Sequence, residues 1–206
     1  MRHRAAGESY NQIIRSVEEE FHVKPSKSHV SNWLRGDHLP DGSVRKFVPS
    51  PTAELGYVIG VLLGDGSMSI CGDHNYRLKL RVTDRDFAQV FAGAIATVLK
   101  RSVPPVRYHT KTNAWHVDAS SLLLQHFLTK PVAELGTIIE QGEECICGFL
   151  RGFFDSEGNI FERNLTASNG DLALLNLVCK CMRILRIEFT GPHFVRKGGR
   201  KVMIRG

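Results

Sequence analysis

Two stretches of the sequence carry the same pattern of small residues followed by an acid. Residues 58–66 read VIGVLLGDG, and residues 150–158 read LRGFFDSEG. In and just before these stretches a small residue recurs at every fourth position: Gly56, Gly60 and Gly64 in the first copy, and Gly148, Gly152 and Ser156 in the second. Residues four apart lie on one face of a helix, and glycine inside a helix costs about 0.5–1 kcal/mol relative to alanine. Because the same costly pattern occurs twice, we predict two helices, at 53–65 and 143–157, whose small-residue faces let their backbones pack in close contact.

The repeat continues beyond these two helices. The offset between matching residues is 92 for Asp65 and Glu157, and 85 for a strand-to-helix step in which residues 82–86 return as residues 167–171. A period of this length favours two copies of one α/β module about a pseudo-twofold axis. We therefore predict an α+β fold, a pair of αββαββα modules whose antiparallel sheets form a saddle, with copy one at 53–130 and copy two at 131–206. The last helix of the second module would begin at residue 206, so we expect it to be missing, and the sequence leaves open whether the C-terminus is truncated.

Within copy one the pattern predicts a helix at 53–65, strands at 67–71 and 76–83, a helix at 84–99, a hairpin at 106–117 and a short helix at 120–128. Copy two repeats this order from residue 143, with its hairpin near 189–205. A two-residue turn at Thr112 and Asn113 would pair His109 with His116, and Arg107 with Asp118. Cysteines 145, 147, 179 and 181 fall in predicted helices at a spacing too short for a zinc site, so we interpret them as buried thiols.

Each small-residue face ends in a carboxylate followed by glycine, Asp65-Gly66 and Glu157-Gly158. Glycine at this position fits a left-handed helix cap, which predicts that both acids lie in the last turn of their helices. A negative charge there is disfavoured by the helix dipole, and paired helices would also bring the two acids together, where they repel. This arrangement favours a bound cation, and carboxylate oxygens beside backbone carbonyls are suitable ligands for Mg²⁺. Asp155 is a weaker candidate ligand, because copy one has Leu63 at that position.

The two stretches resemble the two motifs of the LAGLIDADG homing endonucleases, and the resemblance covers residues 52–206. It implies an intron-encoded, monomeric single-chain pseudo-dimer that hydrolyses both strands of a long double-stranded DNA site with two or more Mg²⁺ ions, for which Mn²⁺ or Ca²⁺ would substitute in binding. The family places its metals on the last acid of each motif, here Asp65 and Glu157, and the backbone carbonyls of Gly64 and Ser156 would contribute. Two alternatives stay open: a transcription regulator with a LAGLIDADG-like fold, and an RNA maturase that binds intron RNA.

The same resemblance identifies a basic position at the start of the second helix of each module. Many members carry lysine there, but this chain has Arg85 in copy one and Gly170 in copy two. Metal ions between the acids would stabilise the attacking and leaving oxygens of an in-line displacement at phosphorus. The proton of the attacking water would leave through solvent, helped by a basic group such as Arg85, which we therefore include with Asp65 and Glu157 among the catalytic candidates.

Basic side chains alternate with apolar ones along the predicted strands. In 76–83 the apolar phase would face the core, and Arg77, Lys79 and Arg81 would face outward. Twisted antiparallel ribbons fit the major groove, where Arg and Lys reach guanine edges and phosphates. The candidate DNA contacts of the two modules are Arg77, Lys79, Arg81, Arg107, His109, Lys111 and His116 in copy one, and Arg163, Thr166, Arg196, Lys197, Arg200 and Lys201 in copy two.

Residues 1–36 are predicted to form a small helical unit that resembles a helix-turn-helix. One helix would run over 8–21 from Ser9 as its N-cap, and a second from Ser26 to Gly36. In that motif the second helix enters the major groove, which makes Lys27, Ser28, His29, Ser31, Asn32 and Arg35 further DNA-contact candidates. A two-helix cap with a solvated polar face is the alternative, and residues 37–52, which contain three prolines, are predicted to be a linker.

Composition agrees with this hypothesis. The 206 residues carry a formal net charge of +6, which is compatible with a polyanionic partner. No apolar stretch approaches the roughly 20 residues that a membrane helix needs. The N-terminus has no apolar export segment, and five cysteines are an odd number. We therefore expect a cytoplasmic protein with reduced thiols.

Overall fold

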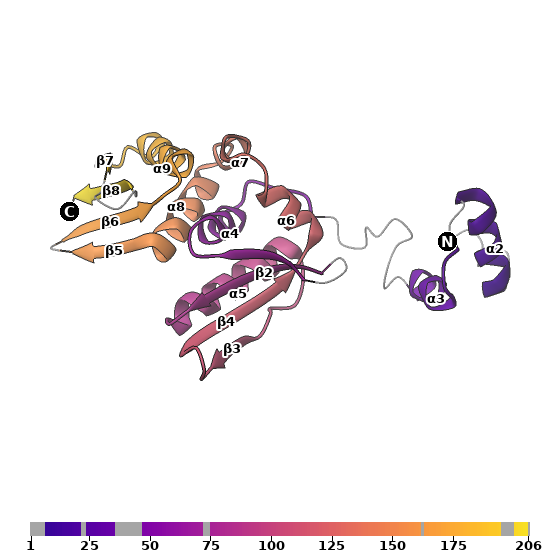
Figure 1. Cartoon of the computed structure of the whole chain (residues 1–206). Coiled ribbons are helices and arrows are strands. Elements are labelled where there is room, and N and C mark those ends of the chain that lie inside the picture. Colours follow the sequence, from indigo (N-terminus) through magenta and orange to yellow (C-terminus); the bar gives the residue numbers. More distant parts are fainter. Residues whose placement is uncertain are drawn as a thin grey trace. The chain divides into compact units, whose positions relative to one another are not determined.

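The computed structural model describes residues 7–21, 24–35, 47–71, 75–161, 163–194 and 200–205. The chain divides into two compact units, 1–46 and 47–206, and each is described by itself (Figure 1). In the described parts of both units, no helix is long and apolar enough to cross a membrane.

The first unit contains the helices α2 (Tyr10–Phe21) and α3 (Lys27–Arg35). Ser9 precedes α2, and its backbone N–H donates to the side-chain oxygen of Gln12 at 2.7 Å, which is one half of a capping box. Ser26 precedes α3, and its hydroxyl accepts the N–H of His29 at 3.2 Å. Ile13 of α2 and Val30 of α3 are buried and form the small core of this unit.

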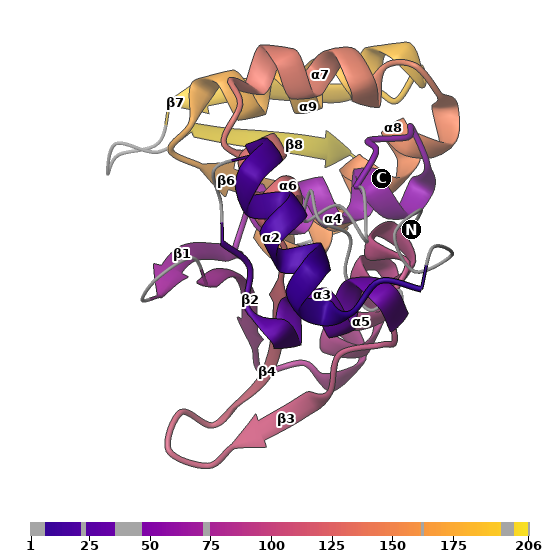
Figure 2. The ribbon, with the colours of Figure 1, turned by 90° about the vertical axis from the view of Figure 1, so that its right-hand side faces the viewer.

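The second unit repeats one arrangement of helices and antiparallel strands. The first module consists of α4 (Ala53–Leu63), β1 (Ser67–Cys71), β2 (Asn75–Val82), α5 (Arg85–Leu99), β3 (Val106–His109), β4 (Ala114–Ser120) and α6 (Leu122–Leu128). The second consists of α8 (Glu143–Glu157), β5 (Gly158–Phe161), β6 (Asn164–Asn169), α9 (Leu172–Ile184), β7 (Phe189–Phe194) and β8 (Arg200–Arg205). The sheet orders β1-β2-β4-β3 and β5-β6-β8-β7 are equivalent, which confirms the α+β class and the duplication. A further helix, α7 (Val132–Ile139), was not predicted from the sequence and lies along α9 (Figure 2).

The helices α4 and α8 pack together as predicted, with one sheet on either side (Figure 1). The glycines of each helix face the backbone of the other. A Cβ atom on Gly60 would lie 2.3 Å from the carbonyl oxygen of Phe149, and one on Gly152 would lie 2.3 Å from that of Tyr57. No side chain fits at such distances, so the close contact explains why both helices accept the cost of interior glycine. We call this contact, formed by Gly56, Gly60, Gly148 and Gly152, the glycine seam.

The ends of the two helices differ from the prediction. Helix α4 ends at Leu63, so Asp65 lies in the turn beyond the helix, whereas Glu157 is the last residue of α8. Neither Gly66 nor Gly158 has a positive φ, so the predicted left-handed caps are wrong. Both glycines are instead required by space, because a Cβ atom would lie 2.5 Å from the Cα of Leu62 at position 66 and 2.1 Å from the carbonyl oxygen of Phe154 at position 158.

The register of the first hairpin also differs. Arg107 lies opposite His116, and His109 lies opposite Ala114, so the predicted pairs of Arg107 with Asp118 and His109 with His116 are wrong. The loop has four residues, 110–113, and is closed by a hydrogen bond from the N–H of Thr112 to the carbonyl oxygen of His109 at 3.1 Å. A two-residue turn of the favoured type needs positive φ at both central residues, which a β-branched threonine resists; here only Asn113 adopts it, with φ of 48°.

The cysteines lie in helices, as predicted, but they are not all buried. Cys145, Cys179 and Cys181 are buried, and burial raises the pKa of the Cys145 thiol to about 11. Cys147 is exposed, which corrects the interpretation of all four as buried thiols. It faces away from the seam because it is one position before Gly148, on another face of α8.

Candidate functional site

The glycine seam brings the ends of the two motifs together. A Cβ atom on Gly64 would lie 2.2 Å from the hydroxyl oxygen of Ser156 and 3.1 Å from Cγ of Glu157. Asp65 is next in the chain, and its charge helps to raise the pKa of Glu157. The two predicted metal-binding acids therefore belong to one small region at the C-terminal ends of α4 and α8.

Both acids are held in an environment that disfavours their charge. Burial raises the pKa of Asp65, and burial followed by the nearby negative charge of Asp65 raises the pKa of Glu157. Among the described residues, no lysine or arginine forms an ion pair with either acid. Two partly desolvated carboxylates without a cation have the charge and the oxygen donors that suit a hard divalent ion.

Asn169 contacts Glu157, and it lies before the second helix of its module, where the family resemblance places polar residues around the metals; its bond to Glu157 was not predicted. Its side-chain Nδ2 donates to Oε1 of Glu157 at 2.7 Å, and this hydrogen bond lowers the pKa of Glu157 against the effects that raise it. The Oδ1 of Asn169 accepts the N–H of Asp171 at 2.8 Å, which fixes the amide. The signal in the sequence was its place at the end of a strand, in the repeated strand-to-helix step.

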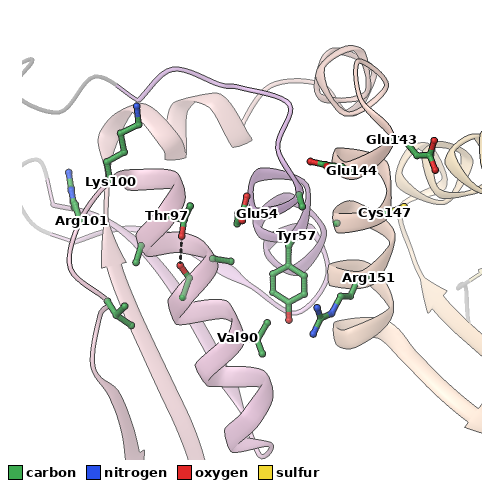
Figure 3. Close-up of a pocket in the computed structure, with 16 residues that line it drawn as sticks. Glu54, Tyr57, Val90, Thr97, Lys100, Arg101, Glu143, Glu144, Cys147 and Arg151 are labelled. Carbon is green, nitrogen blue, oxygen red and sulfur yellow. Dashed lines mark hydrogen bonds between the residues drawn. The ribbon is translucent and has the colours of Figure 1, made fainter.

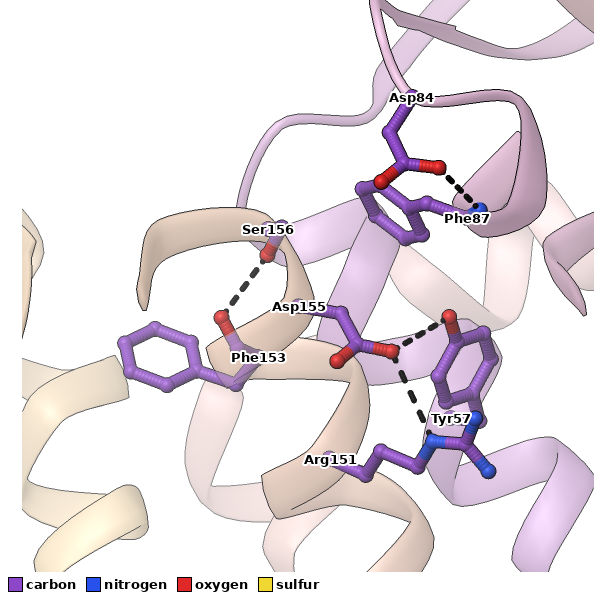
Figure 4. Close-up of polar contacts among 7 residues, drawn as sticks. All are labelled: Tyr57, Asp84, Phe87, Arg151, Phe153, Asp155 and Ser156. Atoms are coloured by element: carbon purple, nitrogen blue, oxygen red, sulfur yellow. Dashed lines mark hydrogen bonds and ion pairs between the residues drawn. The ribbon is translucent and has the colours of Figure 1, made fainter. Parts of the chain in front are cut away.

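The first module has no counterpart of this contact. The predicted match of residues 82–86 with 167–171 is wrong by two residues, because Asp84 and Asp171 are the equivalent helix caps, and Val82 ends β2 where Asn169 ends β6. Val82 has no polar side chain, and Asp84 caps α5: its Oδ1 accepts the N–H groups of Asp86 at 2.8 Å and Phe87 at 3.0 Å (Figure 4). No side-chain hydrogen bond to Asp65 occurs within the described part of the chain. The two acids are therefore supported unequally.

Asp155, the weaker candidate, is engaged in the helix pair. Its Oδ2 accepts a hydrogen bond from the Tyr57 hydroxyl at 2.9 Å and lies 3.6 Å from Nε of Arg151 (Figure 4). Burial, and then the bond to Asp155, raise the pKa of Tyr57. Asp155 thus links α8 to α4, and its position in the structure favours a role in packing. The Ser156 hydroxyl likewise turns to its own helix and donates to the carbonyl oxygen of Phe153 at 3.0 Å.

Arg85 begins α5 and stacks on an aromatic ring. Its guanidinium carbon lies 5.2 Å from the ring centre of Trp115, a cation–π contact. The described ion pairs and hydrogen bonds do not join it to Asp65 or Glu157. Its catalytic role stays a prediction.

The basic candidates of the first module share one face of their sheet. Arg81 lies opposite His116 on β4, and His116 lies opposite Arg107 on β3, so the three form a row across three strands. The neighbouring positions Arg77 and Lys79 continue this face along β2. The ring of His109 stacks on that of His116 with centres 4.1 Å apart, and Lys111 is exposed in the loop. Burial, followed by the charges of His109 and Arg81, lowers the pKa of His116.

The second module presents fewer of its candidates. Arg163 is exposed, but Thr166 is only 4% exposed and its hydroxyl donates to the carbonyl oxygen of Asn159 at 3.2 Å. Thr166 is buried on a strand that pairs with β5 on one side and β8 on the other, so the prediction that it contacts DNA is wrong. Arg200 and Lys201 lie opposite Asn169 and Ser168 on β8. Arg196 and Lys197 lie outside the described residues.

The N-terminal candidates all lie on α3. Lys27, Ser28, His29 and Arg35 are exposed, and Ser31 and Asn32 are half-buried. The His29 ring stacks on Trp33 with centres 6.3 Å apart, and Arg35 donates to the side-chain oxygen of Asn32 at 2.6 Å. The two helices exist, but DNA binding by this unit stays a prediction.

Comparison with solved structures identifies the fold. Variants of the homing endonuclease I-DmoI superpose with a TM-score of 0.59 at 20% identity, over 74% of this chain and 88% of theirs. The complex of I-DmoI with DNA and Mn gives 0.59 at 19%, over 74% and 89%. The N-terminal LAGLIDADG domain of DUF199/WhiA gives 0.53 at 16%, over 78% and 79%. No protein-family model matches the chain. The second unit is therefore a LAGLIDADG fold with two motifs in a single chain, as the sequence resemblance implied.

Sequence comparison then gives the particular family. The uncharacterized protein MJ0398 of Methanocaldococcus jannaschii is 35% identical over 202 residues, which is 96% of this chain and 72% of that protein. The uncharacterized protein MJ0314 of the same organism is 25% identical over 159 residues, 72% of this chain and 60% of that protein. The chain belongs to one family with MJ0398.

Proposed function

We propose that the chain is a homing-type endonuclease that hydrolyses both strands of a long, specific double-stranded DNA target with divalent metal ions. The observation that carries the proposal is the meeting of Asp65 and Glu157, both partly desolvated, at the ends of a helix pair. Because the fold also occurs in a domain of WhiA, the fold alone does not determine the activity. A protein that only bound DNA would need the basic sheet faces but would gain nothing from two unneutralised acids.

The donor set fits Mg²⁺ or a similar hard ion. Asp65 and Glu157 would each supply carboxylate oxygen, with the backbone carbonyls of Gly64 and Ser156 as further candidates. In the described residues no group of three or more His, Cys, Asp or Glu is gathered to hold a metal. The remaining ligands would therefore come from water and from DNA phosphate, as Mg²⁺ commonly accepts. Solved structures of I-DmoI include complexes with DNA and Mn and with DNA and Ca, which supports this class of ion.

A bound divalent ion would stabilise the charge on the oxygens of the phosphate under attack. The chain's own groups would position the reaction. Asn169 orients the Glu157 carboxylate and favours its ionised form. Arg85 would contribute positive charge near the phosphate, and the proton of the attacking water would leave to solvent.

The basic faces would hold the duplex. In the first module the row of Arg81, His116 and Arg107 presents donors for phosphates and guanine edges. We propose that the two modules at 53–206 contact the two halves of the target as a monomer. Residues 1–36 would add contacts through α3, and residues 37–52 would link the two parts.

A cleavage assay tests this function directly. The substrate is a plasmid carrying the uninterrupted sequence formed by joining the DNA on either side of the gene. We expect the full chain to linearise it with Mg²⁺ or Mn²⁺, to bind it uncut with Ca²⁺, and to leave a scrambled plasmid intact. Specific binding with no cleavage in either Mg²⁺ or Mn²⁺ would support the DNA-binding regulator instead.

The contact between Asn169 and Glu157 predicts a change in pH dependence. In Asn169→Ala the carboxylate loses a hydrogen bond that favours its charge, so the pKa of Glu157 rises further above its ordinary value. Protons then compete with the metal for Glu157 at higher pH. We therefore expect the acidic limb of the pH–rate profile for cleavage to move toward neutral pH. The measurement is the cleavage rate against pH at fixed subsaturating Mg²⁺. An unchanged limb in Asn169→Ala, with a folded protein, would contradict this role.

A further inference from the structure

The two modules differ in what covers their second helix. In the second module α7 packs on α9, with Leu135 and Ile139 fully buried. Gly136 of α7 faces Leu177 of α9, since a Cβ atom on this glycine would lie 3.0 Å from Cδ1 of that leucine. An ion pair of 2.7 Å between Lys180 and Glu140 closes the same contact. The chain thus contains its own example of a helix seated on this face of the module.

The corresponding face of the first module is an open groove. Asp84 and Asp171 cap α5 and α9 in the same way, so Val90 on α5 corresponds to Leu177 and Gly93 to Lys180. Leu177 is 7% exposed and Val90 is 39% exposed. The groove has a volume of about 1200 Å³, with α5 and α8 as its walls and α4 as its floor (Figure 3). We call it the α5–α8 groove; Val90, Gly93, Thr97, Tyr57, Cys147 and Arg151 line it.

Gly93 is a second, independent feature of this groove. It lies inside α5, and a Cβ atom there would have no neighbour within 4 Å. Every other glycine inside a described helix, at positions 56, 60, 136, 148 and 152, would place its Cβ atom within 3.0 Å of another element. Interior glycine costs about 0.5–1 kcal/mol relative to alanine. At Gly93, nothing in the described part of the chain explains that cost, but close approach of another helix would.

The charges on the two walls predict which charges the bound helix would carry along its two edges. Lys100 stands at the end of the α5 wall, and Glu143 and Glu144 begin the α8 wall at the same end of the groove (Figure 3). A helix lying between them would be complementary if an acid on one edge faced Lys100 and a base on the other faced the two glutamates. Its apolar stripe would cover Val90 and Tyr57, with its closest approach at Gly93.

We propose that the α5–α8 groove binds an amphipathic helix of a partner protein, seated on the first module as α7 is seated on the second. Recognition would use the helix-in-groove mode, with apolar side chains spaced three and four apart. Arg151 is the lining residue of α8 nearest the acids, and Glu157 ends the same helix six residues further on, roughly 9 Å away at 1.5 Å per residue. The partner would therefore leave the acid pair accessible, and the proposal does not depend on nuclease activity.

The exposed thiol of Cys147 makes the groove measurable. The probe is a synthetic peptide of residues 131–142, which contains α7, held helical by a lactam between the positions of Ala133 and Thr137, both exposed on α7. We expect the peptide to slow alkylation of Cys147 in the full chain, by about tenfold at ten times its dissociation constant. Mass spectrometry of the digested protein separates Cys147 from the buried Cys145, Cys179 and Cys181.

A matched pair of variants identifies the site. Gly93→Leu fills the proposed point of closest approach and should abolish protection, whereas the smaller side chain of Gly93→Ala should weaken it. The new Cβ atom of either variant has no neighbour within 4 Å, so neither should lower the melting temperature. A peptide with Leu135→Asp and Ile139→Asp should give no protection.

Three outcomes would overturn the proposal. One is no protection at millimolar peptide. Another is equal protection in Gly93→Leu, which would mean that the peptide binds elsewhere, for example by displacing α7. The last is protection that rises with protein concentration in the absence of peptide, which would identify a second copy of the chain as the occupant.

Discussion

The Asp65→Asn and Glu157→Gln variants are expected to lose double-strand cleavage by a hundred- to a thousand-fold, roughly the several kcal/mol that metal-assisted charge stabilisation supplies. Each substitution keeps the shape of the side chain and removes one charged oxygen donor from the acid pair. The measurement is the single-turnover rate of plasmid linearisation in Mg²⁺, with binding of the same target followed in Ca²⁺. We expect binding to change little, because the basic faces are untouched.

Stability gives the control for these variants. The pKa of each acid is higher in the folded protein than its ordinary value, so folding favours the protonated form. As pH rises through the ordinary pKa toward the folded one, each carboxylate therefore costs stability, and that cost persists at neutral pH. Removing the charge should leave the metal-free melting temperature at pH 7 unchanged or raised. A variant that cuts both strands at the original rate would show that the assignment of these acids is wrong.

The Gly60→Ala variant is expected to lose about 3 kcal/mol of stability, at the upper end of the cost of overpacking. Its new Cβ atom would lie 2.3 Å from the carbonyl oxygen of Phe149 and 2.6 Å from the N of Phe153. Backbone cannot swing aside as a flexible side chain can, so the helices must separate. For a domain of this size the melting temperature should fall by roughly 6–12 °C, measured by thermal unfolding without metal. Separation would also move Asp65 from Glu157, so cleavage should fall at temperatures where the variant is still folded.

Gly93→Ala is the matched control, since it makes the same change inside a helix of the same unit. Because its Cβ atom meets nothing within 4 Å, the better helix propensity of alanine should raise the stability by about 0.5–1 kcal/mol. If Gly60→Ala were as stable as Gly93→Ala, the close contact of α4 and α8 would not exist as described.

The features that followed from sequence are those with a periodic or repeated signal. Glycines at every fourth position predicted the helix pair, because only a close contact gives that pattern a physical reason. The bounds of α8 and β1 agree with the prediction to the residue. The meeting of the two motifs followed from the same pattern, since residues 64 and 156 end equivalent faces. The alternation along β2 likewise placed Arg77, Lys79 and Arg81 on one face.

The features that were missed depend on contacts between distant segments. The hydrogen bond from Asn169 to Glu157 joins the end of a strand to the end of a helix, and no spacing encodes it. The exposure of Thr166 depends on the strands beside it. The register of β3 and β4 depends on the length of the loop between them, which is four residues, and the sequence of 110–113 does not distinguish this loop from a two-residue turn. Helix α7 was missed because its apolar face, with Leu135 and Ile139, covers α9 and repeats nothing in the first module.

The glycine seam also separates what can vary in this protein from what cannot. At its four positions even a methyl group would clash with backbone atoms of the other helix, so substitutions there are not tolerated. The outward faces of the two sheets carry no such restriction, and each module has a separate sheet. In a homodimer, one substitution would change both subunits. Here one polypeptide contains both modules, so a substitution in one sheet leaves the other sheet unchanged. Under the proposed function, the contacts to each half of an asymmetric, non-palindromic target could therefore change separately while the glycine seam stays constant.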